Sequence, residues 1–323
     1  MTLSNLTKGY ACAAIAACTY GINPLLALPL YARGMNADSV LFFRYGFATL
    51  MLWGLMYALH KPFRLRRRQI PMMAIAAILM ALSSLLLFEA YNYMDVGIAS
   101  TLLFVYPVMV AVINTIFYRE RLSAITISAI AMATVGIMLL YQGDGTATLN
   151  VTGTILVLLA ALSYAVYMVA VNRTSLCNVE SMALSFYSVG IGIVVFLAGM
   201  AWNGFTPVRG ALGWTCALSL ALFPTIISLI TMVIAIHNIG STPTAILGAL
   251  EPVTALVIGV CVFGEHLSLS ACAGIVLVVG SVTMLIAARP AARLVKQFIH
   301  SHRRLHLHLP RKQARQDTLG KLR

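Results

Sequence analysis

Glu251 is the residue of this sequence with the clearest capacity for chemistry, because it is acidic, lies in a long apolar stretch and precedes Pro252. It is the only acidic residue between Arg209 and Glu265. A carboxylate well inside a membrane helix costs about 2.5–3.5 kcal/mol on insertion scales unless it is paired or hydrated. Glu251 is therefore expected to face a cavity or the interior of a helix bundle. In that position Glu251 either binds a proton or a substrate ammonium group, or it is a protonated carboxylic acid that forms a hydrogen bond between helices.

Two motifs occur twice with the same offset. Tyr106-Pro107 lies 145 residues before Glu251-Pro252, and a Glu-(Arg/His)-Leu-Ser sequence stands at 120–123 and again at 265–268. This common offset predicts an internal repeat. Tyr106 is the repeat partner of Glu251, so it is expected to line the same cavity or to pack between helices. Each Pro removes a backbone hydrogen bond, which either opens the helix for a ligand or only kinks it.

The two Glu-(Arg/His)-Leu-Ser sequences precede apolar runs. A carboxylate and a Ser are the groups that the unpaired backbone N–H groups of a helix start need, so we expect these turns to cap helices. Ion binding by Glu120 or Glu265 is the alternative. The two turns are expected on opposite membrane faces, so they cannot form one site.

Two further pairs, Tyr20 with Asn23 and Tyr164 with Tyr167, have i, i+3 spacing and lie 144 residues apart. That spacing places each pair on one face of a helix. Repeat-equivalent faces approach the pseudo-twofold axis, where proteins built from inverted repeats bind ligands. We expect these four side chains to line a central cavity, and packing or hydrogen bonding between helices is the alternative.

Three polar residues stand at the ends of apolar runs. Asn92 and His237 are 145 residues apart, and Glu89 lies close to Asn92. They are expected near opposite membrane faces, which indicates gating or anchoring at the interface rather than one shared site. Arg44, a few residues into another apolar run, either attracts an anionic substrate or extends its charged end to the outer surface.

The elements that must position these residues follow from the composition. Hydrophobic residues make up 60% of the 323 residues, charged residues 10%, and the mean hydropathy is +0.91. Only 20 charged side chains occur before residue 289, so this part cannot form a water-covered globule. A membrane helix needs about 20 mainly apolar residues. The sequence therefore predicts an all-α polytopic membrane protein with ten transmembrane helices, at 9–32, 39–60, 70–91, 97–118, 122–141, 152–172, 180–202, 212–236, 243–263 and 268–288.

The repeat divides these spans into two sets of five. Five is an odd number, so the second set must enter the membrane from the opposite face. We expect two inverted five-helix repeats, residues 1–141 with spans 1–5 and residues 142–288 with spans 6–10, followed by a basic cytoplasmic tail at 289–323.

Two five-span halves, each with a Pro-containing fourth span that ends in a Glu-(Arg/His)-Leu-Ser turn, resemble the EamA-domain members of the drug/metabolite transporter superfamily. The resemblance covers roughly residues 9–288. It implies a central cavity between the halves and a location in the inner membrane of a bacterium. It also implies a secondary transporter, with export of small organic metabolites such as amino acids as the expected activity. The long basic tail is a departure from typical members.

The main alternative is a membrane enzyme or a lipid-handling protein that uses polar residues inside the membrane. The sequence argues against an enzyme, because the spans lack a nucleophile–base pair and a metal triad and most loops are short. A phosphate-binding loop is also absent, and no cofactor or metal is expected. The expected partners are a small-molecule substrate and anionic membrane lipids, the latter at the basic segment 61–68 and the tail. Nucleic-acid binding is not expected, because basic clusters beside apolar spans are topology signals first.

The distribution of basic residues predicts the orientation. Nineteen of the 22 Lys and Arg residues fall on one side of the ten-span arrangement and three, Arg33, Arg44 and Arg209, on the other. The positive-inside rule then places both termini in the cytoplasm.

Reporter fusions test this orientation. Fusions after Leu65, Arg119 and Arg293 should report the cytoplasm, and fusions after Asp38, Asp144 and Arg209 should report the outer side. Two consecutive fusions on the wrong side would overturn the ten-span arrangement.

Overall fold

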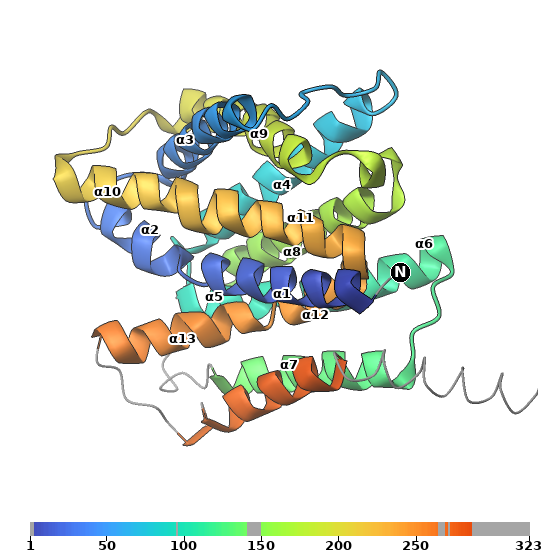
Figure 1. Cartoon of the computed structure of the whole chain (residues 1–323). Coiled ribbons are helices and arrows are strands. Elements are labelled where there is room, and N and C mark those ends of the chain that lie inside the picture. The colour runs from blue at the N-terminus through green and yellow to red at the C-terminus, as the bar shows by residue number, and fades with distance from the viewer. Residues whose placement is uncertain (1–2, 95, 141–149, 264–268, 271, 286–323) are drawn as a thin grey trace, which may run out of the picture.

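The computed structural model describes residues 3–94, 96–140, 150–263, 269–270 and 272–285, which form helices joined by short connections and contain no strand (Figure 1). The helices are α1 (Leu3–Tyr20), α2 (Asn23–Tyr31), α3 (Ala37–Ala58), α4 (Ile70–Ala90), α5 (Val96–Leu103), α6 (Tyr106–Tyr118), α7 (Ala124–Leu140), α8 (Val151–Arg173), the 3₁₀ turn η1 (Ser175–Asn178), α9 (Ser181–Asn203), α10 (Gly210–Ala221), the π-helical turn η2 (Leu222–Ile227), α11 (Ser228–Ile239), α12 (Ser241–Leu247), α13 (Leu250–Phe263) and a further helix, Cys272–Leu285. Three features predicted from the sequence lie outside the described residues: the tail at 289–323, the turn at 265–268 and residues 142–149 at the start of the second half.

Six stretches are long and apolar enough to cross a membrane, namely Asn5–Tyr31, Ala37–Ala58, Ile70–Ala90, Val151–Arg173, Ser181–Asn203 and Gly210–Ile239. Shorter apolar helices follow at Tyr106–Tyr118, Ala124–Leu139 and Cys272–Leu285. The expectation of an all-helical, multi-pass membrane protein is thereby confirmed. The count of ten spans stays a prediction, because the predicted spans at 97–118 and 243–263 are each divided between two shorter helices.

Proline residues account for three helix interruptions, which follow α1, α5 and α12. A Pro has no N–H to donate to the carbonyl four residues earlier, and its ring clashes with that carbonyl. Pro24 lies four residues after Tyr20, where α1 ends, and Pro107 lies four residues after Leu103, where α5 ends. Pro252 lies four residues after Gly248, which caps the end of α12. The first predicted span, 9–32, is therefore broken in two rather than continuous.

The membrane stretch Gly210–Ile239 stays continuous at Pro224 through a π-helical turn. The Thr225 hydroxyl donates to the Leu220 carbonyl at 2.8 Å, which is the carbonyl that Pro224 leaves without its α-helical donor. The N–H of Ser228 bonds to Phe223 O instead of Pro224 O. The Pro224 carbonyl is thus left to accept from a side chain.

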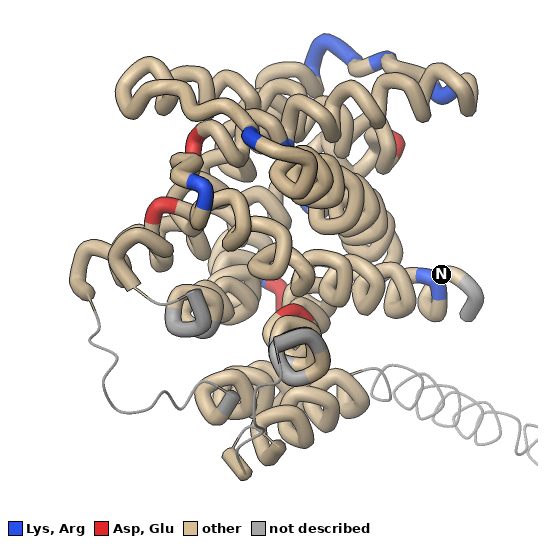
Figure 2. The backbone as a smooth tube through the Cα atoms, turned by 90° about the vertical axis from the view of Figure 1, so that its left-hand side faces the viewer, with Lys and Arg blue, Asp and Glu red and all other residues tan. Residues whose placement is uncertain are grey.

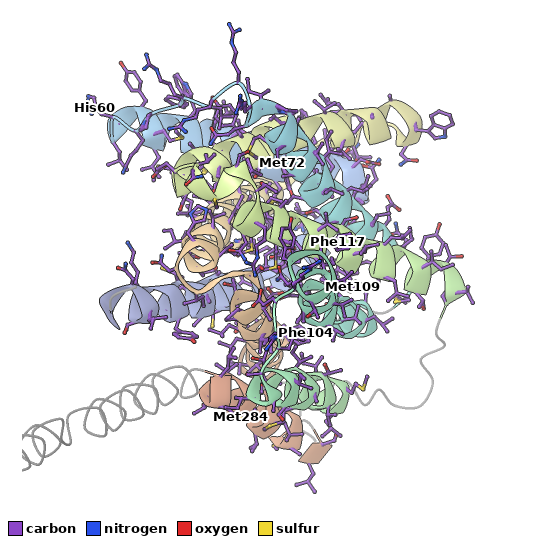
Figure 3. The ribbon with its side chains drawn as sticks, turned by 90° about the vertical axis from the view of Figure 1, so that its right-hand side faces the viewer. His60, Met72, Phe104, Met109, Phe117 and Met284 are labelled. Carbon is purple, nitrogen blue, oxygen red and sulfur yellow. The ribbon has the colours of Figure 1, made fainter. Side chains whose placement is uncertain are left out.

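The outer surface of the bundle is apolar. Leu50, Ile116 and Phe117 are 66%, 66% and 76% exposed, and Figure 3 labels Phe117 on α6. Helix α7 and Cys272–Leu285 pack together at one side of the molecule (Figure 1), where a methyl group on Gly136 would lie 2.9 Å from the Gly274 carbonyl oxygen. Exposed apolar helices with internally paired backbones are what lipid requires.

One end of the bundle collects most of the described basic groups and is named the basic end. Lys61 Nζ lies 3.8 Å from Glu180 Oε1 at the start of α9, and Arg173 forms an ion pair with Glu120. Figure 2 shows a run of basic residues on the loop at 61–68 and few charges along the helices. At the opposite end, Asn36 caps α3 and donates to the Gly204 carbonyl at 2.9 Å.

The first Glu-Arg-Leu-Ser turn caps its helix through the serine. Ser123 Oγ accepts from Thr126 N at 3.1 Å at the start of α7, as the sequence predicts. Glu120 instead pairs with Arg173. The carboxylate of this turn therefore connects two helices, and the expectation that it caps α7 is corrected.

A glycine in α9 provides a test of this packing. Asp38 is fully buried, and a methyl group at Gly199 would overlap its carboxylate. Gly199→Ala should lower the free energy of unfolding by about 1–3 kcal/mol, the usual penalty for overpacking. Gly190 on the same helix is the matched control, because its methyl group would come no closer than 3.5 Å to Thr49. Gly190→Ala should be neutral or stabilising by up to about 1 kcal/mol, since Ala favours helix over Gly.

Thermal unfolding of both variants in detergent, followed by far-UV circular dichroism, measures the difference. Equal midpoints for the two variants would contradict the close contact between α9 and Asp38.

Candidate functional site

Glu251 lies where three internal cavities meet. With their open mouths included, their volumes are about 450, 490 and 260 Å³, and Glu251 lines all three. The carboxyl group that the sequence singles out is thus at the centre of the polar interior.

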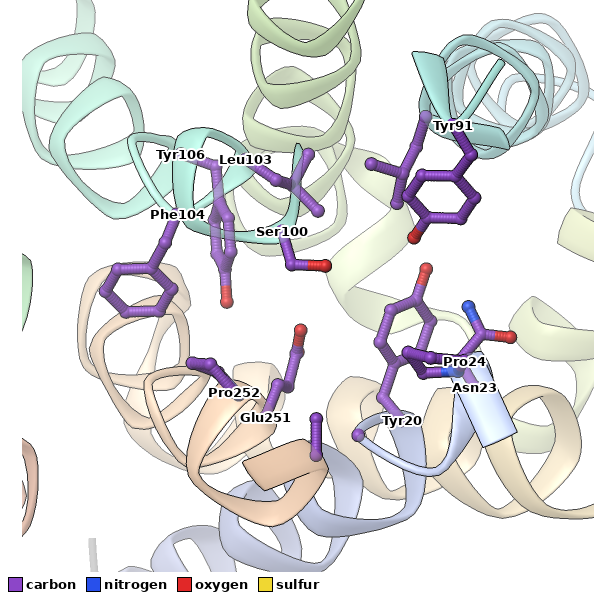
Figure 4. Close-up of a pocket in the computed structure, with 13 residues that line it drawn as sticks. Tyr20, Asn23, Pro24, Tyr91, Ser100, Leu103, Phe104, Tyr106, Glu251 and Pro252 are labelled. Carbon is purple, nitrogen blue, oxygen red and sulfur yellow. The ribbon is translucent and has the colours of Figure 1, made fainter. Parts of the chain in front are cut away.

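The helix break between α12 and α13 explains how a carboxylate reaches this position. Glu251 is in the first turn of α13, where the unpaired N–H groups and the helix dipole favour a negative charge. Its carboxylate makes no hydrogen bond or ion pair with the side chain of any other residue that the structure describes. In Figure 4 the Glu251 side chain points into the same space as the side chains of Tyr106 and Ser100. A proton or a bound cation would find an unoccupied acceptor here.

Aromatic side chains separate the cavities. Tyr106, in the first turn of α6, and Tyr164, in α8, meet edge to face with ring centroids 5.0 Å apart. The Tyr164 hydroxyl donates to the sulfur of Met232 at 2.8 Å. Tyr106 lines the first and third cavities, and Tyr164 lines the second and third. Residues from both predicted halves therefore enclose the carboxyl group.

Tyr20 and Asn23 reach the site because α1 ends between them. Tyr20 lines the first and second cavities, and Asn23 lines the first. Asn23 is 3% exposed and accepts a hydrogen bond from Arg44 at 3.2 Å. In Figure 4 the Tyr20 hydroxyl points toward Tyr91, and Asn23 lies on the side of Tyr20 away from Glu251.

Tyr167 lies behind the cavity wall. It is fully buried, it lines none of the three cavities, and its hydroxyl lies 3.3 Å from Ser188 Oγ. Its ring stacks on Tyr164 with centroids 6.4 Å apart. The structure thus brings five of the six predicted substrate-binding residues together and places the sixth where it supports Tyr164.

Arg44 is the residue whose importance the sequence left undecided. It is 2% exposed and lines the second cavity, so extension of its charged end to the outer surface is excluded. Its guanidinium donates to Thr225 Oγ1 at 2.7 Å and to the Pro224 carbonyl at 3.1 Å. Its Cζ atom lies 5.6 Å from the centroid of the Tyr20 ring. No residue spacing indicated this contact, because the carbonyl that Pro224 leaves without a donor is that of Leu220, which Thr225 satisfies, whereas Arg44 binds the carbonyl of Pro224 itself.

The three predicted gate residues lie away from the cavities. Asn92 donates to Glu89 at 3.0 Å just beyond α4, and none of the three residues lines a cavity. His237 Nδ1 lies 3.5 Å from Ser181 Oγ at the start of α9, and its buried Nε2 has no hydrogen-bond partner among the described residues. Glu89 and His237 thus occupy opposite ends of the bundle, which agrees with the expectation of two separate positions.

A polar network joins the two predicted halves at the basic end. Asn114 in α6 donates to Ser241 Oγ at 2.9 Å and to Thr242 Oγ1 at 3.1 Å in α12. Asn172 in α8 donates to the same Ser241 hydroxyl at 3.0 Å. Nothing in the residue spacing indicated this network, because its members come from three separate helices.

Known proteins share the sequence pattern and the fold. The model of the EamA-like transporter family matches residues 7–142 and again residues 151–287. The chain belongs to the EamA-like transporter family. The curated relatives that match the chain are named as transporters.

Curated members and a solved structure add detail. An uncharacterized transporter of Bacillus subtilis (strain 168), YxxF, is 23% identical over 206 residues, which cover 63% of this chain and 65% of the relative. An uncharacterized transporter of Archaeoglobus fulgidus is 25% identical over 177 residues, which cover 54% of this chain and 62% of the relative. The matches thus span less than two thirds of the length of these curated relatives. A solved structure, described only as the crystal structure of a protein, aligns with a TM-score of 0.77 at 15% identity over 89% of this chain and 99% of its own, and so shares the fold.

A substitution at Gly248 tests the geometry of this EamA-like site. A methyl group there would overlap the Tyr106 hydroxyl, so Gly248→Ala should lower stability by about 1–3 kcal/mol. The Tyr106→Phe background removes the overlapping hydroxyl, and the cost of Gly248→Ala should become smaller there.

Thermal unfolding of the wild type, both single variants and the double variant gives the coupling energy between the two positions. An equal cost of Gly248→Ala in both backgrounds would mean that Tyr106 does not rest on Gly248.

Proposed function

We propose that the protein is a secondary transporter that exports small organic metabolites, such as amino acids, across the inner membrane of a bacterium. Family membership supports transport of small molecules. The observation that carries the proposal is the Glu251 carboxyl group, which borders three cavities at the start of a discontinuous helix. Discontinuous helices that begin near the bilayer midplane are typical of substrate sites in secondary transporters.

Alternating access fits the order of the cavities. The first is bordered by Tyr91, directly after α4 and toward the opposite end of the bundle. The third is bordered by Ala13 and Thr244, toward the basic end. Rocking of the two inverted halves would open Glu251 to one end at a time, and the network around Ser241 would close the basic end in the state described. The double match of the family model supports two related halves.

The orientation proposed from the sequence is compatible with these contacts. The loop at 61–68, Arg173 and the start of α9 share the basic end. Under the positive-inside rule this end and both termini face the cytoplasm. Exposed arginines of the loop would then meet anionic lipid headgroups, each contributing about 1 kcal/mol near the surface.

A membrane enzyme or lipid-handling protein is the weaker candidate. Family names indicate transport. No His or Cys is present among the described residues that line the three cavities, so Glu251 has no imidazole or thiol beside it to form a nucleophile–base pair.

A metabolite screen followed by flux measurement tests the function. Thermal shifts of the purified protein identify ligands that stabilise the folded state, and proteoliposomes then measure their flux. Absence of flux for every stabilising ligand would contradict a transporter.

Glu251→Gln tests the site. Gln keeps the shape and the capacity for hydrogen bonds but does not titrate, so the variant should fold while transport falls at least about tenfold, equivalent to about 1.4 kcal/mol. The pH dependence of transport should flatten as well.

The control is Glu180→Gln, which changes a carboxylate that pairs with Lys61 at the basic end and lines none of the cavities. It should retain transport per folded molecule. Wild-type rates and an unchanged pH profile in Glu251→Gln would show that Glu251 is structural.

A further inference from the structure

Arg44 is a buried cation without an anionic partner in the described structure. It is 2% exposed, and its three hydrogen bonds go to neutral acceptors: a hydroxyl, an amide and a backbone carbonyl. The two ion pairs found within 4.0 Å among the described residues do not include it. Removing a guanidinium from water without a counter-charge costs several kcal/mol, so the cavity beside it favours an anion.

The nearby acidic side chains on the same side are held by other groups. Asp38 Oδ2 accepts from Asn203 at 2.7 Å while its buried Oδ1 has no hydrogen-bond partner among the described residues, and Glu89 accepts from Asn92 at 3.0 Å. Neither lies within ion-pair distance of Arg44. Glu251 lines the same cavity of about 490 Å³ as Arg44 but is also beyond that distance.

The guanidinium is fixed in orientation. Its Nε donates to Thr225, Nη1 to Asn23 at 3.2 Å and Nη2 to the Pro224 carbonyl. A guanidinium has five N–H donors, so one N–H on each terminal nitrogen lies outside these three hydrogen bonds, and the Tyr20 hydroxyl is a neutral partner for the group. A carboxylate is a stronger acceptor for a guanidinium than a neutral hydroxyl.

We propose that Arg44 binds the anionic group of the transported metabolite while Glu251 binds its amino group, so that the substrate is a small zwitterion. This inference rests on the proposed function. The remaining wall of the shared cavity is largely apolar, with Met80, Leu87 and Leu103 among its residues, and accepts an uncharged side chain. The cavity therefore recognises two opposite charges and one apolar group.

A zwitterion satisfies both buried charges at once. A ligand with only an amino group leaves Arg44 without a counter-charge, and a ligand with only a carboxylate leaves Glu251 without one. Loss of one charged hydrogen-bonding partner at a buried site lowers affinity strongly, because the remaining group stays desolvated and unpaired. We expect each single-charge analogue to bind at least tenfold more weakly than the zwitterion.

Two matched ligand series test this recognition in the wild-type protein. The first is L-phenylalanine, phenethylamine and 3-phenylpropionate, and the second is L-leucine, 3-methylbutylamine and 4-methylpentanoate. Thermal shift gives the relative affinities, and flux into proteoliposomes gives the transport rates. An amino acid that binds and moves at least tenfold better than its amine and its acid supports the proposal. An amine or acid that equals its amino acid overturns it.

Variants assign the charges to their residues. Arg44→Gln should lose the preference for the amino acid over the amine, whereas Glu251→Gln should lose the preference over the acid. Arg44→Lys keeps the positive charge but loses the guanidinium donors, so it should retain part of the preference for the amino acid over the amine. This variant tests the same assignment if Arg44→Gln fails to fold. Glu180→Gln is the matched control, because Glu180 lines none of the three cavities and its loss should preserve the order of ligands.

The outcomes separate this inference from the proposed function. Unchanged discrimination in Arg44→Lys and Arg44→Gln would remove Arg44 from the site while transport stands. Flux of other metabolites with none for either amino acid series would overturn the zwitterion and leave the transporter. Absence of flux for every metabolite tested would contradict both.

Discussion

Backbone hydrogen bonding inside the membrane constrains every other feature of this protein. Lipid offers no partner to an unpaired N–H or carbonyl group, so a helix can be interrupted only where protein or a polar cavity supplies one. Pro24, Pro107 and Pro252 interrupt three helices at the level of the cavities. The polar interior exists where these interruptions converge, and the surrounding helices shield it from lipid.

The same constraint places the two buried charges. Glu251 stands at a helix start created by Pro252, and Arg44 is anchored by the carbonyl that the π-helical turn at Pro224 leaves available. Both charges thus depend on backbone groups released by a proline. They are contributed by α13 and α3, which lie in different predicted halves of the chain. A movement of one half relative to the other would therefore change the separation between Arg44 and Glu251.

Much of this arrangement could be predicted from the sequence, because apolar run length fixes membrane helices and a repeated offset identifies equivalent positions. Glu251, Tyr106 and Tyr20 lie together for that reason. Spacing along one helix could not distinguish Tyr164, which borders a cavity, from Tyr167, which lies behind it, because both share a face and the difference depends on the neighbouring helix. The buried position of Arg44 depends on a carbonyl in a π-helical turn 180 residues later in the chain. Such a turn leaves no periodic pattern in the sequence.

In the cavity shared by Arg44 and Glu251, the charged side chains and the apolar wall come from different helices, which has an evolutionary consequence. The charged groups come from α3 and α13, whereas the apolar wall comes from α4, α5 and α11, which contribute Met80, Leu87, Leu103, Leu229 and Met232. Substitutions in that wall change the volume offered to a ligand and leave the buried charges untouched. If the proposed function holds, descendants of one ancestral gene could therefore accept different ligands through small steps in these wall helices, and the two buried charges would be inherited unchanged.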